Sequence, residues 1–303
     1  MLPPDDFDPP VGVAEVLEPG LRRIVAPNPS PMTYRGTNTY LLGTTALAVV
    51  DPGPAHDAHL DAILGALGPG QTVSHIVVTH AHLDHAPLAG PLAAATGAPV
   101  LAFGAATAGR SAVMQALASG GLADGGEGID AQFQPDIHLA DGDIVAGPDW
   151  SLDVVHTPGH LGNHICLGWG TACLTADHVM GWASSLVSPP DGDLTDFMAS
   201  CEKLAARDWR VFYPGHGAPI LDPAARLTWL IKHRREREAA ILAALDAGPA
   251  TAEQIASAVY TDTPSALLPA ATRNVLAHLI DLLGKSAVRP LDQLGADTRF
   301  TRT

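Results

Sequence analysis

The chain has 303 residues, of which 47% are hydrophobic and 16% charged, and its formal net charge is −15. This length allows one large or two modest domains with a substantial core, and the composition is typical of an ordered globular protein. A strongly acidic chain repels phosphate backbones at long range, which weighs against nucleic acid as the main partner. Because a local basic patch or a bound cation can invert the field around a site, nucleic acid stays open as an alternative.

The three cysteines, Cys166, Cys173 and Cys201, are too few and too far from a CxxC pattern to predict a disulfide framework. Sparse cysteines of this kind indicate a reducing compartment. The first residues lack a basic segment followed by an apolar run, and no uncharged apolar run reaches the roughly 18 to 20 residues that span a bilayer. We therefore expect a cytoplasmic protein with no membrane partner.

The first half of the chain alternates strands with helices. Residues 1–20 are rich in Pro and Asp and predict an extended lead-in. Strands are predicted over 21–26, 39–43, 46–50, 73–78 and 99–103, and helices over 58–67 and 88–96. This alternation predicts an α/β layered sheet. The stretch 104–135, with one helix expected over 111–119, is either a substrate-facing lid or a mobile loop.

The second half changes to β structure and then to longer helices. Strands are predicted over 137–139, 143–145, 152–156, 164–167, 172–175 and 211–213, and helices over 195–206 and 223–246. Because Gly248-Pro249 breaks the chain, we expect one domain over residues 1–247 and a smaller one over 248–303. In the smaller domain, residues 251–254 have the spacing of a helix capping box. A further helix over 273–283 and a strand over 287–291 make this domain resemble a winged helix.

One stretch holds more metal-binding side chains than packing requires. The side chains of His80, His82, Asp84 and His85 lie within six residues, directly after the apolar strand 73–78. Neutral imidazole and carboxylate are ligands that zinc and related divalent ions prefer. The alternative is a polar surface loop that is His-rich by chance, and the ligands found later in the chain make it the weaker interpretation.

Three later strands end in candidate ligands of the same kind. His160 follows the strand 152–156, Asp177 follows another, and His216 follows a third. Loops at one edge of a sheet can converge on a single site, and five imidazoles with two carboxylates are too many for one ion. Two neighbouring cations need a bridging anion, for which Asp177 is a natural choice. Water between two such ions loses a proton near neutral pH and becomes a nucleophile.

The HxHxDH stretch, followed by a lone His, an Asp and a final His, resembles the signature of the metallo-beta-lactamase superfamily. The resemblance covers about residues 20–220 and implies a four-layered αβ/βα sandwich, here with a small C-terminal winged-helix-like domain. The ligand sets it implies are His80, His82 and His160 for one ion, Asp84, His85 and His216 for the other, and Asp177 as the bridge. An Asp bridge, where many true beta-lactamases have Cys, resembles the glyoxalase II, lactonase and ribonuclease members.

We therefore predict that residues 1–247 form the catalytic domain of a dinuclear metal-dependent hydrolase that uses a metal-bridging hydroxide. Asp84 and Asp177 are expected to be the catalytic carboxylates, with Asp84 also able to shuttle a proton. Zinc is the expected ion, with iron and manganese as alternatives. A small ester, thioester or lactone is the expected substrate, because the chain is acidic and has no Lys/Arg stripe.

A narrower resemblance favours another substrate. The segments 27–29, 36–41 and 177–182, with the C-terminal domain, resemble the beta-lactamase-like 2 group, which includes enzymes that cut single-stranded RNA. RNA binding requires a basic groove, which 17 Lys and Arg residues make hard to build. A third interpretation is a nucleic-acid-binding regulator with structural metals. Otherwise the C-terminal domain is expected to cover the site or to mediate a homodimer.

The other histidines and the nearby aromatic residues receive weaker assignments. His164 is a candidate for orienting a ligand, and His156 and His178, which flank candidate ligands, either do the same or are only their neighbours. Surface or core roles are expected for His56, His59, His75, His138, His233 and His278. Candidates for the pocket wall are Trp182, Tyr34 and Tyr213. The loops 104–135 and 179–192 are expected to set substrate choice.

Overall fold

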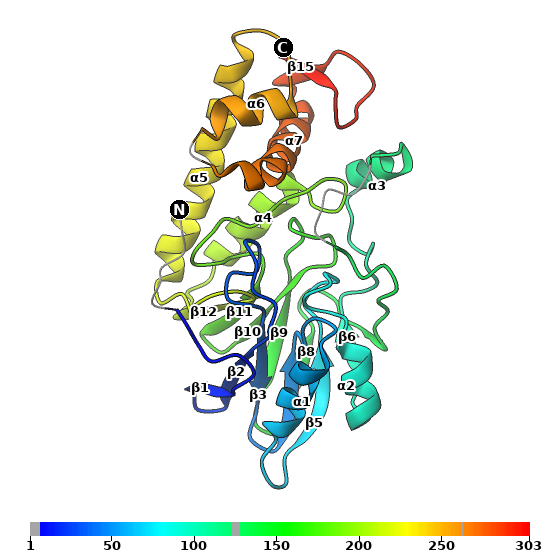
Figure 1. Ribbon diagram of the computed structural model, residues 1–303, viewed down its shortest axis with the longest axis vertical. Coiled ribbons are helices and arrows are strands. Elements are labelled where there is room, and N and C mark those ends of the chain that lie inside the picture. Colours follow the sequence, from blue (N-terminus) through cyan, green and yellow to red (C-terminus); the bar gives the residue numbers. More distant parts are fainter. Residues whose placement is uncertain (1–6, 123–127, 262) are drawn as a thin grey trace.

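The computed structural model of the protein describes residues 7–122, 128–261 and 263–303. Two β-sheets lie face to face, and helices cover their outer faces (Figure 1). The first sheet has the strand order β1-β2-β3-β4-β5-β6-β7 and the second has the order β12-β11-β10-β9-β8. The predicted four-layered αβ/βα sandwich of the α/β class is confirmed.

The first sheet combines an antiparallel half with a parallel half. Its strands are β1 (Glu15–Glu18), β2 (Leu21–Val25), β3 (Asn38–Leu42), β4 (Ala46–Val50), β5 (Thr72–Val77), β6 (Val100–Ala102) and β7 (Ile137–His138). Strands β4 to β7 pair in parallel, with α1 (Asp57–Gly65) and α2 (Ala89–Thr96) as the crossovers between β4, β5 and β6. Ile63 of α1 and Leu92 of α2 are fully buried against this sheet, which fixes its outer face.

The second sheet is antiparallel except for the pair of β11 and β12, which is parallel. Its strands are β8 (Ile144–Ala146), β9 (Ser151–His156), β10 (Ile165–Trp169), β11 (Ala172–Ala176) and β12 (Val211–Pro214). Strands β11 and β12 run parallel because α4 (Leu194–Ala205) lies between them in the chain. Phe197 and Cys201 of α4 and Leu230 of α5 (Pro223–Leu245) are buried against the outer face of this sheet. All three cysteines are free and buried.

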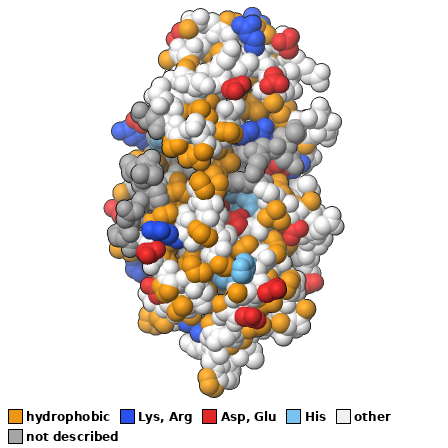
Figure 2. All heavy atoms as spheres, in the orientation of Figure 1, with side chains coloured by type: hydrophobic (Ala, Val, Ile, Leu, Met, Phe, Trp, Pro, Cys, Tyr) orange, Lys and Arg blue, Asp and Glu red, His pale blue; other side chains and the backbone are white. Residues whose placement is uncertain are grey.

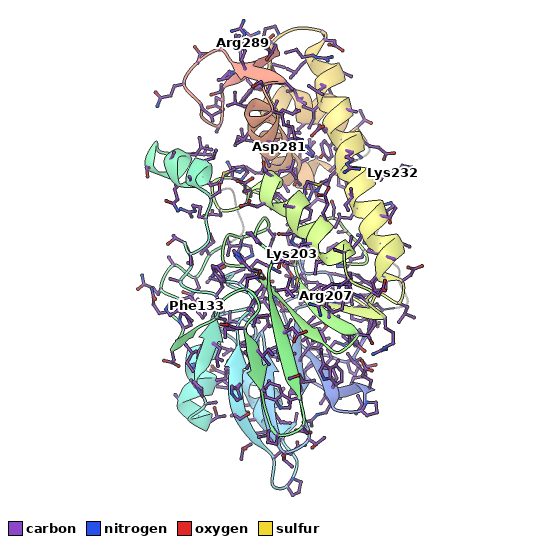
Figure 3. All side chains as sticks on the ribbon, turned by 180° about the vertical axis from the view of Figure 1, so that it is seen from behind. Phe133, Lys203, Arg207, Lys232, Asp281 and Arg289 are labelled. Atoms are coloured by element: carbon purple, nitrogen blue, oxygen red, sulfur yellow. The ribbon has the colours of Figure 1, made fainter. Side chains whose placement is uncertain are left out.

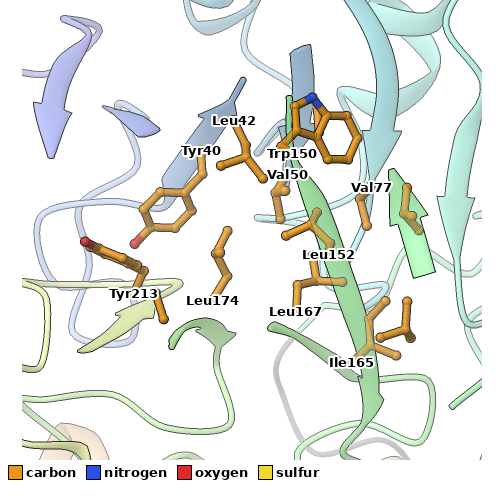
Figure 4. Packing of buried hydrophobic residues seen from close by; sticks show 14 of the residues in the cluster. Tyr40, Leu42, Val50, Val77, Trp150, Leu152, Ile165, Leu167, Leu174 and Tyr213 are labelled. Carbon is orange, nitrogen blue, oxygen red and sulfur yellow. The ribbon is translucent and has the colours of Figure 1, made fainter. Parts of the chain in front are cut away.

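The core between the sheets comes from side chains that alternate along the strands. Leu42 and Val50 of the first sheet face Leu152, Leu167 and Leu174 of the second (Figure 4). Side chains of a strand point to opposite faces in turn, so each strand supplies this layer with every second residue and its helix-covered face with the others. The strand ends are thereby held rigidly at both edges of the sandwich.

The C-terminal domain has the helix pair and small sheet of a winged helix. It contains α6 (Ala252–Val259), the 3₁₀-helix η1 (Ser265–Leu267), α7 (Leu268–Gly284) and a three-stranded sheet of β13 (Ala250–Thr251), β15 (Arg299–Arg302) and β14 (Val288–Pro290). The predicted capping box is confirmed: Thr251 Oγ1 accepts from Gln254 N at 3.2 Å, and Gln254 Oε1 accepts from Thr251 N at 3.0 Å. Ile241 and Leu245 from the end of α5 share the core of this domain.

One helical stretch, Ser265–Gly284, is long and apolar enough by length and composition to cross a membrane, with a mean hydropathy of 1.2. Its side chains have another explanation. Val275, Leu276 and Leu279 are buried against α6 and the end of α5, and half of the apolar window lies inside the protein. The stretch is therefore the core helix of the C-terminal domain.

The structure differs from the sequence prediction in several elements. Strand β1 lies inside the expected lead-in, and its exposed Val16 explains why no buried pattern marked it. Helix α7 begins at Leu268 instead of residue 273, because Pro269 sits in its first turn, where a missing N–H does no harm. Strands β13 and β15 were not predicted, since each is short. Residues 1–6 of the lead-in and 123–127 of the long loop lie outside the described residues, and the domain boundary at 247/248 stays a prediction.

Candidate metal centre

All seven candidate ligands follow the ends of strands that meet at one edge of the sandwich. The HxHxDH stretch follows β5, and the remaining three ligands follow β9, β11 and β12. Strands β9 and β11 run in the same direction, since both are antiparallel to β10, and β12 is parallel to β11. Asn38 Nδ2 of the first sheet donates to Pro214 O of the second at 2.9 Å, which joins the two sheets at this edge.

The first group of ligand atoms joins His80, His82, His160 and Asp177. His82 Nδ1 lies 3.0 Å from His80 Nε2 and 3.1 Å from His160 Nε2. Asp177 Oδ2 lies 3.9 Å from His80 Nε2 and 3.6 Å from His160 Nε2. Nitrogens bound to one zinc ion at about 2 Å are roughly 3.3 Å apart in a tetrahedron. The spacing of these buried atoms therefore suits a single cation.

The second group joins Asp84, His85, His216 and again Asp177. His216 Nε2 lies 3.1 Å from Asp84 Oδ2 and 3.3 Å from Asp177 Oδ2. His85 Nε2 lies 3.4 Å from Asp84 Oδ2 and 3.4 Å from Asp177 Oδ1. His85 Nε2 and Asp177 Oδ1 are buried without a hydrogen-bond partner, which is costly unless a cation satisfies them. Asp177 belongs to both groups, the position that a bridging carboxylate requires.

Asp51, at the end of β4, holds the first half of the centre in place. Its Oδ1 accepts from Thr79 N at 2.8 Å, and its Oδ2 accepts from Thr79 Oγ1 at 2.8 Å. The same Oδ2 lies 2.9 Å from His85 Nδ1, and Thr79 Oγ1 lies 3.0 Å from His80 Nδ1. A carboxylate that binds Nδ1 directs the free Nε2 lone pair of an imidazole toward a metal. Asp51 was not predicted, although its place after a parallel neighbour of β5 is a signal that sequence carries.

Backbone carbonyls orient two further imidazoles. His160 Nδ1 lies 2.7 Å from Leu186 O, and His216 Nδ1 lies 3.1 Å from Gly36 O. A carbonyl can only accept, so each Nδ1 donates a proton to it, and Nε2 is the nitrogen of each ring left to bind a metal. Both Nε2 atoms face Asp177. An outer partner therefore fixes which nitrogen points into the centre for His80, His85, His160 and His216.

The local charges favour a cation at this place. Burial lowers the pKa of His82 to about 3, so its imidazole is neutral at pH 7. Burial also lowers the pKa of His85, but nearby carboxylates, Asp84 first, outweigh it and hold that pKa well above its ordinary value. The pKa of His216 is raised to about 10 in the same way by Asp177 against the effect of burial. Protons held by carboxylates in this manner are those that a divalent ion displaces when it binds.

A pocket of about 370 Å³ opens over the second group. Asp84, Asp177 and His216 lie at one side of it, and Met32 and Leu83 are among its other lining residues. Among the described residues, no Lys or Arg lines this pocket. His side chains show in the middle of the face drawn in Figure 2, and the Lys and Arg side chains drawn there are scattered. Apart from the candidate ligands, the described residues that line this pocket are neutral.

The weaker assignments have mixed outcomes. The ring of His164 lies 5.0 Å from that of His80, but its Nδ1 binds Thr157 Oγ1 and its Nε2 has no partner, so it packs against a ligand without orienting it by a hydrogen bond. His156 stacks on Phe103 and binds a backbone carbonyl through Nε2.

Of the three aromatic residues predicted to line the pocket, two lie at a pocket and one does not. Tyr34 and Trp182 line a second pocket of about 250 Å³, next to Gly217. Tyr213 instead packs on Tyr40 and binds Glu18 Oε1 at 2.5 Å, away from both pockets.

This fold and this site define the class of the protein. The sequence model of the metallo-beta-lactamase superfamily matches residues 32–216, and that of the beta-lactamase associated winged helix domain matches residues 251–292. The chain belongs to the metallo-beta-lactamase superfamily and carries a C-terminal winged helix domain, as the resemblance implied.

Among its relatives, a beta-lactamase-like protein 2 homolog of Drosophila melanogaster is 31% identical over 280 residues, which cover 88% of this chain and 89% of that protein. An atrochrysone carboxyl ACP thioesterase of Aspergillus fumigatus is 28% identical over 293 residues, which cover 90% of this chain and 82% of that protein. A solved metallo-beta-lactamase family protein from Thermus thermophilus superposes with a TM-score of 0.75 at 28% identity, over 95% of this chain and 100% of that one.

Proposed function

We propose that the protein is a dinuclear metal-dependent hydrolase of a small ester, thioester or lactone. The observation that supports this most is the sharing of buried Asp177 between two groups of imidazole and carboxylate atoms. Two such groups, with one carboxylate in common, leave room for water and substrate beside the ligands. Hydrolase chemistry is also the activity that thioesterase names indicate among the relatives of this chain.

The residues fit two divalent ions, with zinc expected and iron or manganese as alternatives. The first ion would be held by His80, His82 and His160, the second by Asp84, His85 and His216, and both by Asp177. When bound, such ions acidify water and polarise a carbonyl or phosphoryl oxygen.

The chain's own residues then move the proton and admit the substrate. Asp84 is the candidate proton acceptor, because its side chain is 25% exposed in the open pocket whereas that of Asp177 is 8% exposed. Its Oδ2 also accepts from Thr37 Oγ1 at 3.3 Å, which limits its rotation. Asp177 is too enclosed to exchange a proton freely with solvent and serves to hold the two groups together.

A thioester is the substrate class that the relatives favour within this proposal. Thioesterases that act on an acyl carrier protein, by their names, are 28% to 30% identical to this chain. A neutral acyl centre needs no cationic pocket, and the pocket over the second group has no basic lining residue among those described.

Cleavage of single-stranded RNA is the alternative that the resemblance to the beta-lactamase-like 2 group implies, and two relatives named beta-lactamase-like protein 2 homolog are 31% and 30% identical to this chain. Two cations of the C-terminal domain are already engaged, since Arg273 binds Ser188 and Lys285 pairs with Glu238 and Asp281. The central part of α7 is also buried, which weighs against the third interpretation, a regulator that reads nucleic acid with this helix.

A substrate panel at low and high salt tests these alternatives. We expect hydrolysis of acyl thioesters or lactones at rates that change little with salt, because no phosphate contacts are made. An RNA nuclease would instead lose activity steeply as salt rises, since each phosphate contact releases counterions. The Asp177→Asn variant serves as the control for contaminating activity. Cleavage of short RNA oligomers alone, with a steep salt dependence, would contradict the proposed substrate class.

A further inference from the structure

The loop 183–190 makes two contacts with the candidate metal centre. The Ser185 hydroxyl donates to the backbone carbonyl of Asp177 and, at 3.1 Å, to that of His178. Leu186 O lies 2.7 Å from His160 Nδ1. The loop therefore orients a ligand of the first group and supports the backbone of the ligand that both groups share.

Helix α5, which covers part of the outer face of the second sheet, binds this loop. Arg226 Nη2 donates to Ala183 O at 2.6 Å, and Arg234 Nη2 donates to Ser185 O. Arg234 is only 2% exposed, and within the described part of the chain it forms no ion pair with a carboxylate. Burial of a cation without a counter-charge costs free energy. An apolar side chain would fill this buried position without that cost. The burial of Arg234 therefore indicates that its guanidinium does more than pack.

Helix α7 of the C-terminal domain binds the same loop. Asn274 Oδ1 accepts from Val187 N at 3.1 Å and from Arg234 Nη1 at 3.0 Å, which links the two helices to each other and to the loop. Arg273 Nε donates to Ser188 Oγ at 3.0 Å, and Arg273 Nη2 donates to Pro189 O. Val275 and Leu276, the next residues of α7, are buried in the core of the C-terminal domain and anchor this turn of the helix. The helix thus holds Arg273 and Asn274 rigidly.

We propose that Arg226 and Arg234 of α5, together with Arg273 and Asn274 of α7, form a clamp by which these two helices set the position of the metal ligands. The clamp fixes loop 183–190, the loop fixes His160 through Leu186 O and Asp177 through Ser185, and the ligands keep the spacing that a metal pair requires. These four are positioning residues that touch neither substrate nor ion. The winged helix domain acts here as a brace for the metal centre, with no need for nucleic acid. The inference rests on the proposed dinuclear centre.

A hydrogen bond that joins α7 to α4 without reaching the loop provides a control. Thr195 Oγ1 of α4 donates to Asp281 Oδ1 of α7 at 2.8 Å, and Figure 3 labels Asp281 beside α4. Thr195→Val removes this bond at nearly constant volume. It weakens the docking of α7 as the clamp variants do, but leaves every contact of loop 183–190 unchanged.

The test is the affinity of the full-length protein for cobalt(II), measured by competition with a chelator, for Arg234→Met, Asn274→Ala, Asn274→Asp and Thr195→Val. Loss of an outer partner typically weakens metal binding by about 10- to 100-fold. We expect about tenfold weaker binding of one ion in Arg234→Met and Asn274→Ala, because each acts through the loop. Asn274→Asp keeps the acceptor oxygen and should bind cobalt nearly as wild type, as should Thr195→Val. Thermal unfolding of each metal-free variant shows whether it is folded.

The outcomes separate the clamp from the proposed function. Two cobalt ions in the wild type, with unchanged affinity in Arg234→Met and Asn274→Ala, would overturn the clamp and leave the hydrolase proposal standing. Equal loss in Thr195→Val would also overturn it, since general domain docking would then explain the effect. A wild type that binds no cobalt would overturn both. If Arg234→Met does not fold, the comparison of Asn274→Ala with Asn274→Asp decides.

Discussion

Replacing Asp177 with Asn is expected to lower kcat by about 100- to 1,000-fold, the range seen when one charge-stabilising group is removed from an active site. Asp177 places Oδ2 within 4 Å of three candidate imidazoles and Oδ1 beside a fourth. The amide is nearly the same size but has no negative charge to offset two cations. The backbone carbonyl that binds Ser185 is unchanged, so the variant should remain folded. Turnover and metal content are the measurements, with circular dichroism for the fold.

Asp153→Asn is the matched control for this loss of charge. Asp153 lies on β9, where its half-exposed carboxylate pairs with Arg207 at 3.2 Å on the surface. An exposed pair of this kind contributes little, so activity and metal content should stay at the wild-type level. Wild-type turnover in Asp177→Asn would remove its bridging role, whatever the control shows.

Replacing Asp51 with Ala should destabilise the metal-free protein by about 3–5 kcal/mol, the usual cost of removing one partner of a buried charged network. The Thr79 amide and hydroxyl and His85 Nδ1 all lose their acceptor. Asp51 also has a φ of +50°, which Asn tolerates and Ala does not adopt readily. Because His85 loses its orienting partner, metal affinity should fall by about 10- to 100-fold. Urea unfolding and chelator competition measure the two effects.

Two further variants test whether the loss of stability is specific to the buried carboxylate of Asp51. Asp51→Asn keeps the backbone conformation and one acceptor, so it should lose less stability than Asp51→Ala. Asp149 is an exposed carboxylate that accepts from Thr44 N at 2.9 Å and from Thr44 Oγ1 at 2.6 Å. Asp149→Ala removes a comparable set of bonds at the surface and should cost no more than about 1 kcal/mol. An equal cost for Asp51→Ala and Asp149→Ala would show that Asp51 has no special role.

The candidate ligands could be predicted from the sequence because each follows an apolar strand. His160, Asp177 and His216 are far apart along the chain, yet strand direction alone brings their loops to one edge. The spacing within HxHxDH then supplies the rest of both groups. The fold was predictable for a similar reason, since helix and strand periods alternate cleanly between residues 21 and 103.

The residues that hold the ligands in place, such as Asp51 and Arg234, could not be predicted in the same way. Asp51 also follows an apolar strand, but it stands in an Asp-Pro-Gly sequence typical of an ordinary turn, so it was interpreted as the end of the strand and not as a partner of His85. Arg234 lies in a charged run that predicts a solvated helix face, yet it is buried because α7 and loop 183–190 cover it. The contacts of Arg234 depend on how α7 packs against α5. The residue pattern of one helix does not indicate which other elements will cover it.

The central claim is that this edge of the sandwich holds two divalent ions that the reaction requires. Elemental analysis of protein purified without chelator, combined with activity before and after chelation, tests it most directly. We expect about two ions per chain, loss of activity on chelation, and recovery when zinc, manganese or iron is restored. Protein that contains no metal and whose hydrolytic activity is unaffected by chelation would contradict the claim.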